Sequence, residues 1–286
     1  MKQASFDVLG NIALVKFQKG VSSRTKKEFA RKLLSKQRSV KTVLEKTGRF
    51  KGRLRKQTTK YIAGEKTKET LYKENGCVFR FNVDSCYFSP RLSNERDEIS
   101  KMVKTGQEVL VMFAGVGPYS IVIAKNSRAR KVYSNEINRE ANKYAELNIE
   151  LNKLKGKVVL LPGDIKRVTK KLTYLSHPPT QKKVVNARKN FISSSTLNVP
   201  AKFDIIVMPR PQLKDTFLHE AFLLSKKRTK VFYYDFCKED EIPNVLKKVK
   251  SEAKKTKKKI KILKVKKAGE IAPYKFRIRV DFRVLN

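Results

Sequence analysis

Two glycines and two carboxylates follow or end apolar runs in the middle of the sequence, between residues 110 and 164. Gly115 and Gly117 lie in the segment LVMFAGVGPYS, directly after such a run. Glu136 ends the run KVYSNE, and Asp164 follows VVLLPG. The glycines let the backbone turn sharply and approach a ligand closely, and a carboxylate accepts hydrogen bonds from two hydroxyls at once. We therefore expect Glu136 to bind the ribose of a nucleoside cofactor and Asp164 to contact its adenine edge.

The glycine turn lacks the third glycine of a dinucleotide-binding loop. Dinucleotide folds use that glycine to pack the helix closely against the strand. Here Pro118 and the bulky Tyr119 follow Gly117 instead. A Gly-x-Gly turn without a pyrophosphate cradle favours S-adenosyl-L-methionine as the cofactor over NAD.

Repeated strand, turn and helix patterns after residue 93 must position these residues. The strands are marked by five apolar runs: EVLVMF, KVYSNE, VVLLPGD, FDIIVMP and KVFYYDF. Such alternation predicts an α/β fold with a mainly parallel, doubly wound, Rossmann-like sheet, whose ligand crevice lies beyond the carboxyl ends of the strands. The tail, from KIKILKV to FRIRVDFRV, supplies two more strands without a helix between them, which predicts an antiparallel hairpin at the end of the sheet.

The chain divides into two predicted domains. Residues 1–92 contain short alternating runs around a basic helical stretch at about 25–34, which predicts a small α+β domain. Residues 93–286 form the predicted Rossmann-like domain. Within it, the polar and basic stretch 177–202 predicts an insertion or a mobile loop.

An excess of positive charge runs along the whole chain. The sequence has 67 Lys and Arg residues against 26 Asp and Glu, a formal net charge of +41. Such a field attracts polyanions and makes their binding steeply salt-dependent. We expect a nucleic-acid partner rather than an acidic membrane surface, because no amphipathic anchor segment stands out. Combined with the cofactor, this charge points to a nucleic-acid methyltransferase.

Other features argue against metal, disulfide and membrane chemistry. Three separated cysteines, Cys77, Cys86 and Cys237, and two histidines show neither metal-ligand spacing nor a disulfide framework. No apolar run reaches the length of a membrane helix, and the N-terminus lacks a signal-peptide pattern. We expect a cytoplasmic protein without a metal ion. We also expect a monomer, because no coiled-coil heptads occur.

Six segments resemble, in this order, one enzyme family: FDVLGNIALVKF, IAGE, YKENG, VDSCYFSPRLSNER, MFAGVGPYS and NIELNKL. The family is the class I tRNA (guanine(37)-N1)-methyltransferases of archaea and eukaryotes, and the resemblance runs from about Ser5 to the C-terminus. YFSPRL followed by Glu-Arg is its most specific block. The resemblance implies a small domain before a Rossmann-like catalytic domain, S-adenosyl-L-methionine as methyl donor, and methylation of tRNA at the guanosine 3′ of the anticodon. Many archaeal members carry an extra N-terminal domain, and we expect this chain to be a short form without it.

The resemblance also assigns residues to the reaction. It implies that Glu95 is the general base that removes the N1 proton of guanine. It implies that Arg55 holds guanine O6 and stabilises the charge that develops there, with Arg53 as the competing assignment in KGRLRKQ. Pro211 keeps the proline of the family's fourth-strand motif and is placed with these catalytic residues. Tyr87 is expected to shape the pocket for cofactor and base.

The expected cofactor-binding residues combine those already named with three that adjoin the matching motifs. Arg91 belongs to YFSPRL, Phe113 belongs to MFAG, and Ile165 follows Asp164. The complete set is Tyr87, Arg91, Phe113, Gly115, Gly117, Glu136, Asp164 and Ile165.

Two positions depart from the family pattern. Val111 stands where the family has an acid that organises the glycine turn, so we expect weaker cofactor binding or a transfer of that work to backbone amides and Glu136. Pro209 replaces an asparagine and removes its hydrogen-bond donor, for which Arg210 is a candidate replacement. These changes leave two alternatives open: an aminocarboxypropyl transferase of wyosine biosynthesis that uses the same cofactor, and a noncatalytic tRNA-binding protein.

Overall fold

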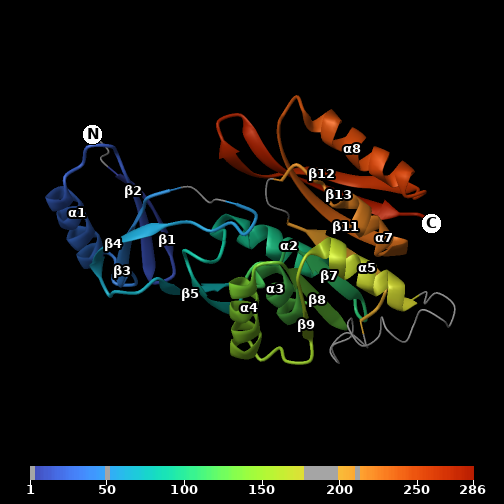
Figure 1. Ribbon diagram of the computed structural model, residues 1–286, viewed down its shortest axis with the longest axis horizontal. Helices are drawn as coiled ribbons and strands as arrows, with labels where there is room; N and C mark the ends of the chain where they lie inside the picture. The colour runs from blue at the N-terminus through green and yellow to red at the C-terminus, as the bar shows by residue number, and fades with distance from the viewer. Residues whose placement is uncertain (1–3, 49–51, 177–198, 210–212) are drawn as a thin grey trace.

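Two sheets and a short hairpin contain the strands of the described residues. A computed structural model describes residues 4–48, 52–176, 199–209 and 213–286. Figure 1 shows a small N-terminal sheet at one end of the molecule and a large sheet with its helices at the other. The predicted insertion at 177–202 lies, up to residue 198, outside the described residues.

The N-terminal sheet has four strands and one covering helix. These elements are β1 (Ala4–Leu9), β2 (Ile12–Phe17), α1 (Ser23–Lys36), β3 (Thr42–Lys46) and β4 (Thr59–Gly64). The strands follow the order β1-β2-β3-β4, with β2 and β3 parallel. Helix α1 buries Ala30 and Leu33 against the sheet, and the Ser22 hydroxyl caps it by accepting a hydrogen bond from the Thr25 amide at 3.1 Å. The helix predicted at about 25–34 is therefore confirmed.

A hairpin of β5 (Glu69–Glu74) and β6 (Cys77–Asn82) follows this sheet along the chain. The hairpin packs on α4 (Arg139–Leu151), where the Asn148 side chain accepts a hydrogen bond from the Arg80 amide at 2.7 Å. This contact joins the hairpin to the helices of the large sheet, although the hairpin lies on the N-terminal side of the domain boundary at residue 92. That boundary stays a prediction.

The large sheet has seven strands among the described residues: β7 (Glu108–Met112), β8 (Lys131–Glu136), β9 (Val158–Pro162), β10 (Phe203–Met208), β11 (Ser225–Lys238), β12 (Ile260–Ala272) and β13 (Lys275–Val284). Their order is β12-β13-β11-β10-β7-β8-β9. The five strands from β9 to β11 are parallel, and β13 runs antiparallel to both of its neighbours. The predicted α/β fold, the mainly parallel sheet and the C-terminal antiparallel hairpin are confirmed.

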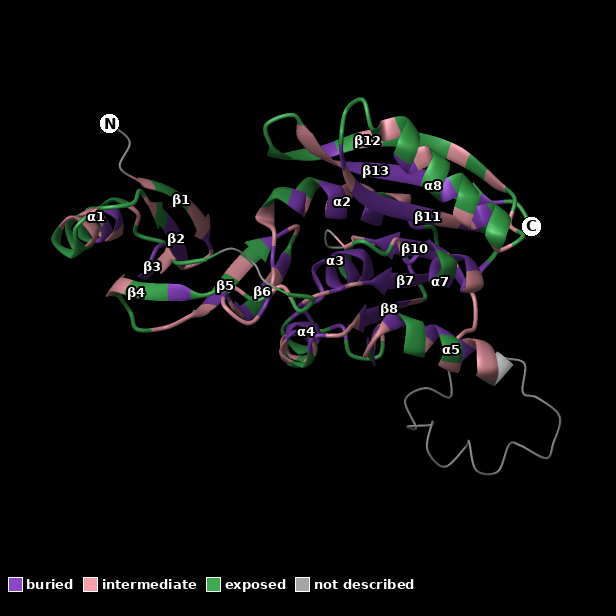
Figure 2. Cartoon of the chain, turned by 45° about the horizontal axis from the view of Figure 1, so that its top comes forward, coloured by how far each residue is buried: buried purple, intermediate pink, exposed green. Residues whose placement is uncertain are grey.

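Helices cover both faces of the large sheet, and the core lies between them (Figure 2). One face packs on α2 (Ser93–Met102), α3 (Pro118–Asn126) and α4, and the other packs on α5 (Ile165–Ser176), α7 (Leu218–Leu223) and α8 (Ile242–Lys255). Strand β7 is buried on both sides, because Val109 and Val111 point to the first face while Leu110 and Met112 point to the second. A continuous apolar run is typical of such a central parallel strand.

Several elements in the C-terminal half differ from the sequence patterns. The helix expected from KDTFLHEAFLLSKK is confined to α7, since β11 already begins at Ser225. The start of β11 is held by Thr229, whose hydroxyl donates a hydrogen bond to the Phe203 carbonyl of β10 at 2.6 Å. Helix α5 was not predicted at all. No helix in the described parts of the chain has the length and apolarity needed to cross a membrane.

Candidate functional site

A pocket of about 540 Å³ opens at the carboxyl ends of the parallel strands. It lies at the junction of β7 and β10, where α3 and α7 leave the sheet toward opposite faces. This is the position at which open α/β sheets bind ligands. The loop 53–55 and the segment 87–92, which precedes α2, complete the wall.

Most of the predicted site residues line this pocket. Gly117 and Glu95 do not, and Pro211 lies outside the described residues. Pro209, which replaces the family asparagine, does line it. The predicted residues found in the wall are Arg55, Tyr87, Arg91, Phe113, Gly115, Glu136, Asp164 and Ile165.

Glu136, at the end of β8, supports the glycine turn. One carboxylate oxygen accepts a hydrogen bond from the Gly115 amide at 2.8 Å, and the other accepts one from the Asn138 amide at 2.7 Å. Burial raises the pKa of Glu136, while the backbone N–H groups of Asn138, Gly115 and Ile137 act in the opposite direction. Two carboxylate oxygens offer about four acceptor sites, so the carboxylate keeps acceptor capacity for ligand hydroxyls.

Gly117 lies behind the turn rather than in the wall. It precedes the first residue of α3 with φ of +85°, a conformation that favours glycine. A Cβ atom there would approach the Ile121 side chain to 3.2 Å. Gly117 therefore allows the turn and close helix packing, but it is not among the described residues that line the pocket.

Asp164, at the end of β9, is engaged by Arg53. The Arg53 guanidinium lies 2.5 Å from one carboxylate oxygen, and the Lys166 amide donates to the other at 2.8 Å. Burial acts to raise the pKa of Asp164, but the hydrogen bond from Arg53 and that from the Lys166 amide outweigh it and lower the pKa. Arg53 thus belongs to the Asp164 end of the pocket.

Apolar side chains also contribute to the pocket wall. Phe113 and Phe217 meet edge to face with ring centroids 5.0 Å apart, and Ile165 and Leu213 also line the pocket. Such a wall suits a flat, apolar ring system with polar edges.

Arg55 and Tyr87 lie together in the wall of the same pocket. The Arg55 guanidinium lies over the Tyr87 ring, 4.7 Å from its centroid. This cation–π contact favours a position of the guanidinium over the ring. Arg91, three-quarters exposed, pairs with Asp7 of β1 at 3.4 Å, so a strand of the N-terminal sheet reaches this site.

Glu95 lies in the first turn of α2 and is 5% exposed. One of its carboxylate oxygens accepts hydrogen bonds from the Tyr234 hydroxyl at 2.8 Å and from the Arg279 guanidinium at 2.7 Å. The other lies 2.6 Å from the Lys266 ammonium. Glu95 is therefore separated from the pocket, and Tyr234 is the wall residue that hydrogen-bonds to it.

Sequence reasoning missed the residues that β11 and β13 contribute. Tyr234, Phe236 and Arg277 line the pocket. Arg279 and Asp281 are buried and hydrogen-bonded to each other at 2.8 Å. Alternating charged and apolar residues in β13 predict a strand with one solvated face. The sequence signal that could have revealed this pair is the opposite charge of residues 279 and 281, which lie two positions apart and so share one face of the strand.

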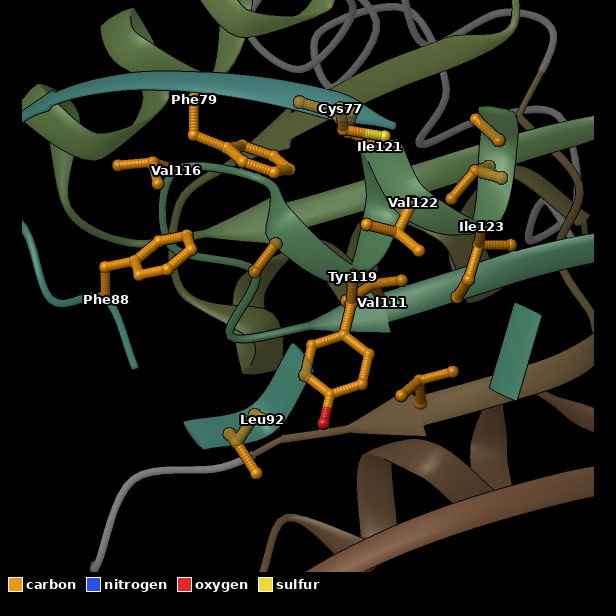
Figure 3. Packing of buried hydrophobic residues seen from close by; sticks show 14 of the residues in the cluster. Cys77, Phe79, Phe88, Leu92, Val111, Val116, Tyr119, Ile121, Val122 and Ile123 are labelled. Atoms are coloured by element: carbon orange, nitrogen blue, oxygen red, sulfur yellow. The ribbon is translucent and has the colours of Figure 1, made fainter. Parts of the chain in front are cut away.

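Val111 is fully buried in the core of the sheet. Figure 3 shows it within the apolar cluster that also contains Tyr119 and Val122. The missing motif acid is thus replaced by a packed side chain, and Glu136 holds the turn from the next strand.

Comparisons with known proteins agree with this arrangement. Residues 70–177 match the TRM5/TYW2 methyltransferase domain, and residues 2–67 match the TYW2 N-terminal domain. The chain is 33% identical to tRNA (guanine(37)-N(1))/4-demethylwyosine(37)-methyltransferase Taw22 from Nanoarchaeum equitans, over 98% of this chain and 100% of that protein. It is 32% identical to tRNA (guanine(37)-N(1))-methyltransferase Trm5b from Pyrococcus abyssi, over 98% and 74% respectively.

Solved structures share the fold over nearly the whole chain. Trm5b from Pyrococcus abyssi matches with a TM-score of 0.79 and 31% identity, covering 99% of this chain and 75% of that one. A complex of aTrm5 with tRNALeu matches at 0.76 and 27%, covering 99% and 72%. Methanocaldococcus jannaschii Trm5 with adenosine matches at 0.74 and 26%, covering 99% and 74%. The chain belongs to the TRM5/TYW2 methyltransferase family, whose relatives compared above include tRNA (guanine(37)-N1)-methyltransferases.

Proposed function

We propose that this protein transfers a methyl group from S-adenosyl-L-methionine to N1 of guanine 37 in tRNA. The observation that carries the proposal is one pocket whose wall contains the Glu136 turn together with Arg55, Tyr87 and Tyr234. One pocket with both sets of residues allows a donor and an acceptor base to meet in line, and such positioning lowers the barrier to transfer.

The cofactor end of the pocket fits an adenosyl group. Glu136 accepts the two ribose hydroxyls with its remaining lone pairs. Phe113, Phe217 and Ile165 enclose the adenine faces, and Asp164 lies at the adenine edge, held by Arg53. The bound cofactor supplies a methyl group on a positively charged sulfur.

The other end of the pocket receives the target base. Arg55, stacked on Tyr87, donates to guanine O6, where negative charge grows as the N1 proton leaves. Glu95 is the final acceptor of that proton. Arg91, beside Asp7 of the N-terminal sheet, adds positive charge near the mouth for the RNA backbone. The net charge of +41 supplies affinity for the rest of the tRNA.

The test is nucleoside analysis of tRNA after reaction. Unmodified tRNA transcripts with guanine or adenine at position 37 are incubated with the protein and the cofactor, digested and examined by mass spectrometry. We expect N1-methylguanosine from the first transcript and no product from the second. Binding of tRNA without any modified nucleoside would instead identify a noncatalytic tRNA-binding protein.

A second candidate function is transfer of the aminocarboxypropyl group of the same cofactor. It is favoured by the match of residues 2–67 to the TYW2 N-terminal domain. The name of the Nanoarchaeum relative also suggests 4-demethylwyosine as a further methyl acceptor. The same assay separates these outcomes, because the two transferred groups differ in mass and a tRNA carrying 4-demethylwyosine reports the second acceptor.

A further inference from the structure

Tyr234 connects the wall of the pocket to Glu95. Tyr234 belongs to the wall of the pocket, yet its side chain is 0% exposed to water. Its hydroxyl donates a hydrogen bond to the Glu95 carboxylate at 2.8 Å and lies 3.1 Å from the Tyr119 hydroxyl. Glu95 does not line the pocket. Among the described wall residues, Tyr234 is hydrogen-bonded to it.

The phenol oxygen of Tyr234 can accept one more hydrogen bond than the two hydroxyl contacts use. An ionised carboxylate only accepts, so the single proton of Tyr234 is committed to Glu95. The Tyr119 hydroxyl must then donate to the Tyr234 oxygen, which it does in the observed arrangement. A phenol oxygen accepts about two hydrogen bonds, so within the described parts of the chain one acceptor position of the Tyr234 oxygen is left over, and only a hydrogen-bond donor fits it.

From this geometry we propose that Tyr234 relays the N1 proton of the target guanine to Glu95. The relay rests on the function proposed above and deepens the role of its base. As N1 bonds to the methyl carbon, the N1–H bond breaks and its proton forms a new O–H bond with Tyr234. The original proton of Tyr234 moves to Glu95, and the bond from carbon to sulfur breaks with its electron pair on sulfur. Tyr234 ends unchanged, Glu95 ends protonated, and the sulfur ends neutral.

The other groups around Tyr234 suit a relay rather than a base. Burial raises the pKa of Tyr234 well above that of a free tyrosine, so the phenol stays protonated between turnovers. The buried Arg279 guanidinium holds the accepting carboxylate, with Asp281 and Glu98 as its further partners. The accepting end of the relay is therefore fixed before a base arrives.

The acceptor position on the Tyr234 oxygen also distinguishes guanine from adenine. Guanine and hypoxanthine present an N1–H donor to the free lone pair of Tyr234, whereas N1 of adenine is an acceptor and would face it lone pair to lone pair. A site whose buried polar group is left unpaired by the wrong ligand rejects it strongly. Tyr234 thereby contributes to the choice of guanine.

The experiment measures single-turnover methylation of guanine-37 tRNA by Tyr234→Phe, Glu95→Gln and the double variant. Loss of the relay is expected to slow transfer about 100-fold, with cofactor and tRNA dissociation constants within about threefold of the wild type. The rate of Tyr234→Phe should rise tenfold per pH unit into the alkaline range, because guanine must then ionise without help. The double variant should be no slower than Glu95→Gln, since the two residues act on one proton.

The matched control is Tyr133→Phe, which removes another buried tyrosine hydroxyl that donates to a glutamate, Glu108, outside the pocket. It should leave the pH profile unchanged. A Tyr234→Phe variant that methylates within threefold of the wild type and keeps its pH profile overturns the relay alone. A Glu95→Gln variant with the wild-type rate overturns both the relay and the assigned base. If the wild-type protein forms no N1-methylguanosine, the proposed function itself fails and the relay falls with it.

Discussion

Glu136→Gln tests the cofactor end of the pocket, because it keeps the size of the side chain and removes its charge. Glu136 accepts hydrogen bonds from the Gly115 and Asn138 amides through different oxygens. Glutamine has one acceptor oxygen, so its NH2 group must face one of these N–H donors. Leaving one N–H unpaired costs about 1–3 kcal/mol in stability.

The same substitution weakens cofactor binding. The carboxylate offers charge-assisted hydrogen bonds to two ribose hydroxyls, each worth about 1.5–3 kcal/mol, against about 0.5–1.5 kcal/mol for a neutral pair. Losing one of them and weakening the other costs about 3 kcal/mol, or about 100-fold in Kd. Because the pKa of Glu136 is raised, the wild-type affinity should fall as the pH decreases through that pKa, whereas the affinity of Glu136→Gln should not.

The assay is isothermal titration of the protein with S-adenosyl-L-methionine at pH 8 and at two acidic pH values. Glu140→Gln is the matched control, since Glu140 lies in the first turn of α4, has a half-exposed side chain and is absent from the pocket wall. Its Kd should stay within twofold of the wild type. A Glu136→Gln Kd within threefold of the wild type at pH 8 would refute the ribose assignment.

Three further predictions follow from the described contacts. Arg55→Ala should slow single-turnover methylation about 100-fold at unchanged cofactor Kd, whereas Arg53→Ala should raise the cofactor Kd less than tenfold and keep the saturated rate; the reverse pattern would exchange their roles. The hydrogen bond from Arg279 holds the pKa of Glu98 at about 2, against 4.5 for a free glutamate, so its stabilisation is present above pH 4.5 and is lost as the pH falls toward 2. After allowance for solvent screening it contributes about 1 kcal/mol, and urea unfolding of Glu98→Gln should show a correspondingly flatter dependence between those pH values. Val111→Asp should bury an uncompensated carboxylate and cost about 3 kcal/mol or more in thermal unfolding experiments; an unchanged melting temperature with tighter cofactor binding would contradict this.

The parallel sheet and the pocket residues at its carboxyl edge could be predicted because both are encoded locally. Each strand is a short apolar run, and Gly115, Glu136 and Asp164 directly follow or end such runs. The carboxyl ends of parallel strands meet at one edge, so position along the chain was enough to place these residues in one pocket.

The surroundings of Glu95 could not be predicted in this way. Glu95 meets Tyr234 and Arg279 across 139 and 184 residues of sequence, and no local period encodes such a contact. The burial of Arg279 could not be predicted either, because a charged residue between apolar neighbours in an antiparallel strand normally faces water. The family motif identified Glu95 but carried no information about the hydrogen bonds that separate it from the pocket.

The loss of the motif acid at position 111 follows from the way the glycine turn satisfies its amides. The Ala114 amide donates to the Asn135 carbonyl at 2.8 Å, the Gly117 amide donates to the Ala114 carbonyl at 3.0 Å, and the Gly115 amide donates to Glu136. These three donors are paired without any side chain from residue 111, which is free to pack in the core as valine. Glu136 therefore supports the turn, and in the function proposed above it also binds the ribose. Because one carboxylate performs both tasks here, its replacement should weaken cofactor binding more in this chain than in a relative that keeps the second acid.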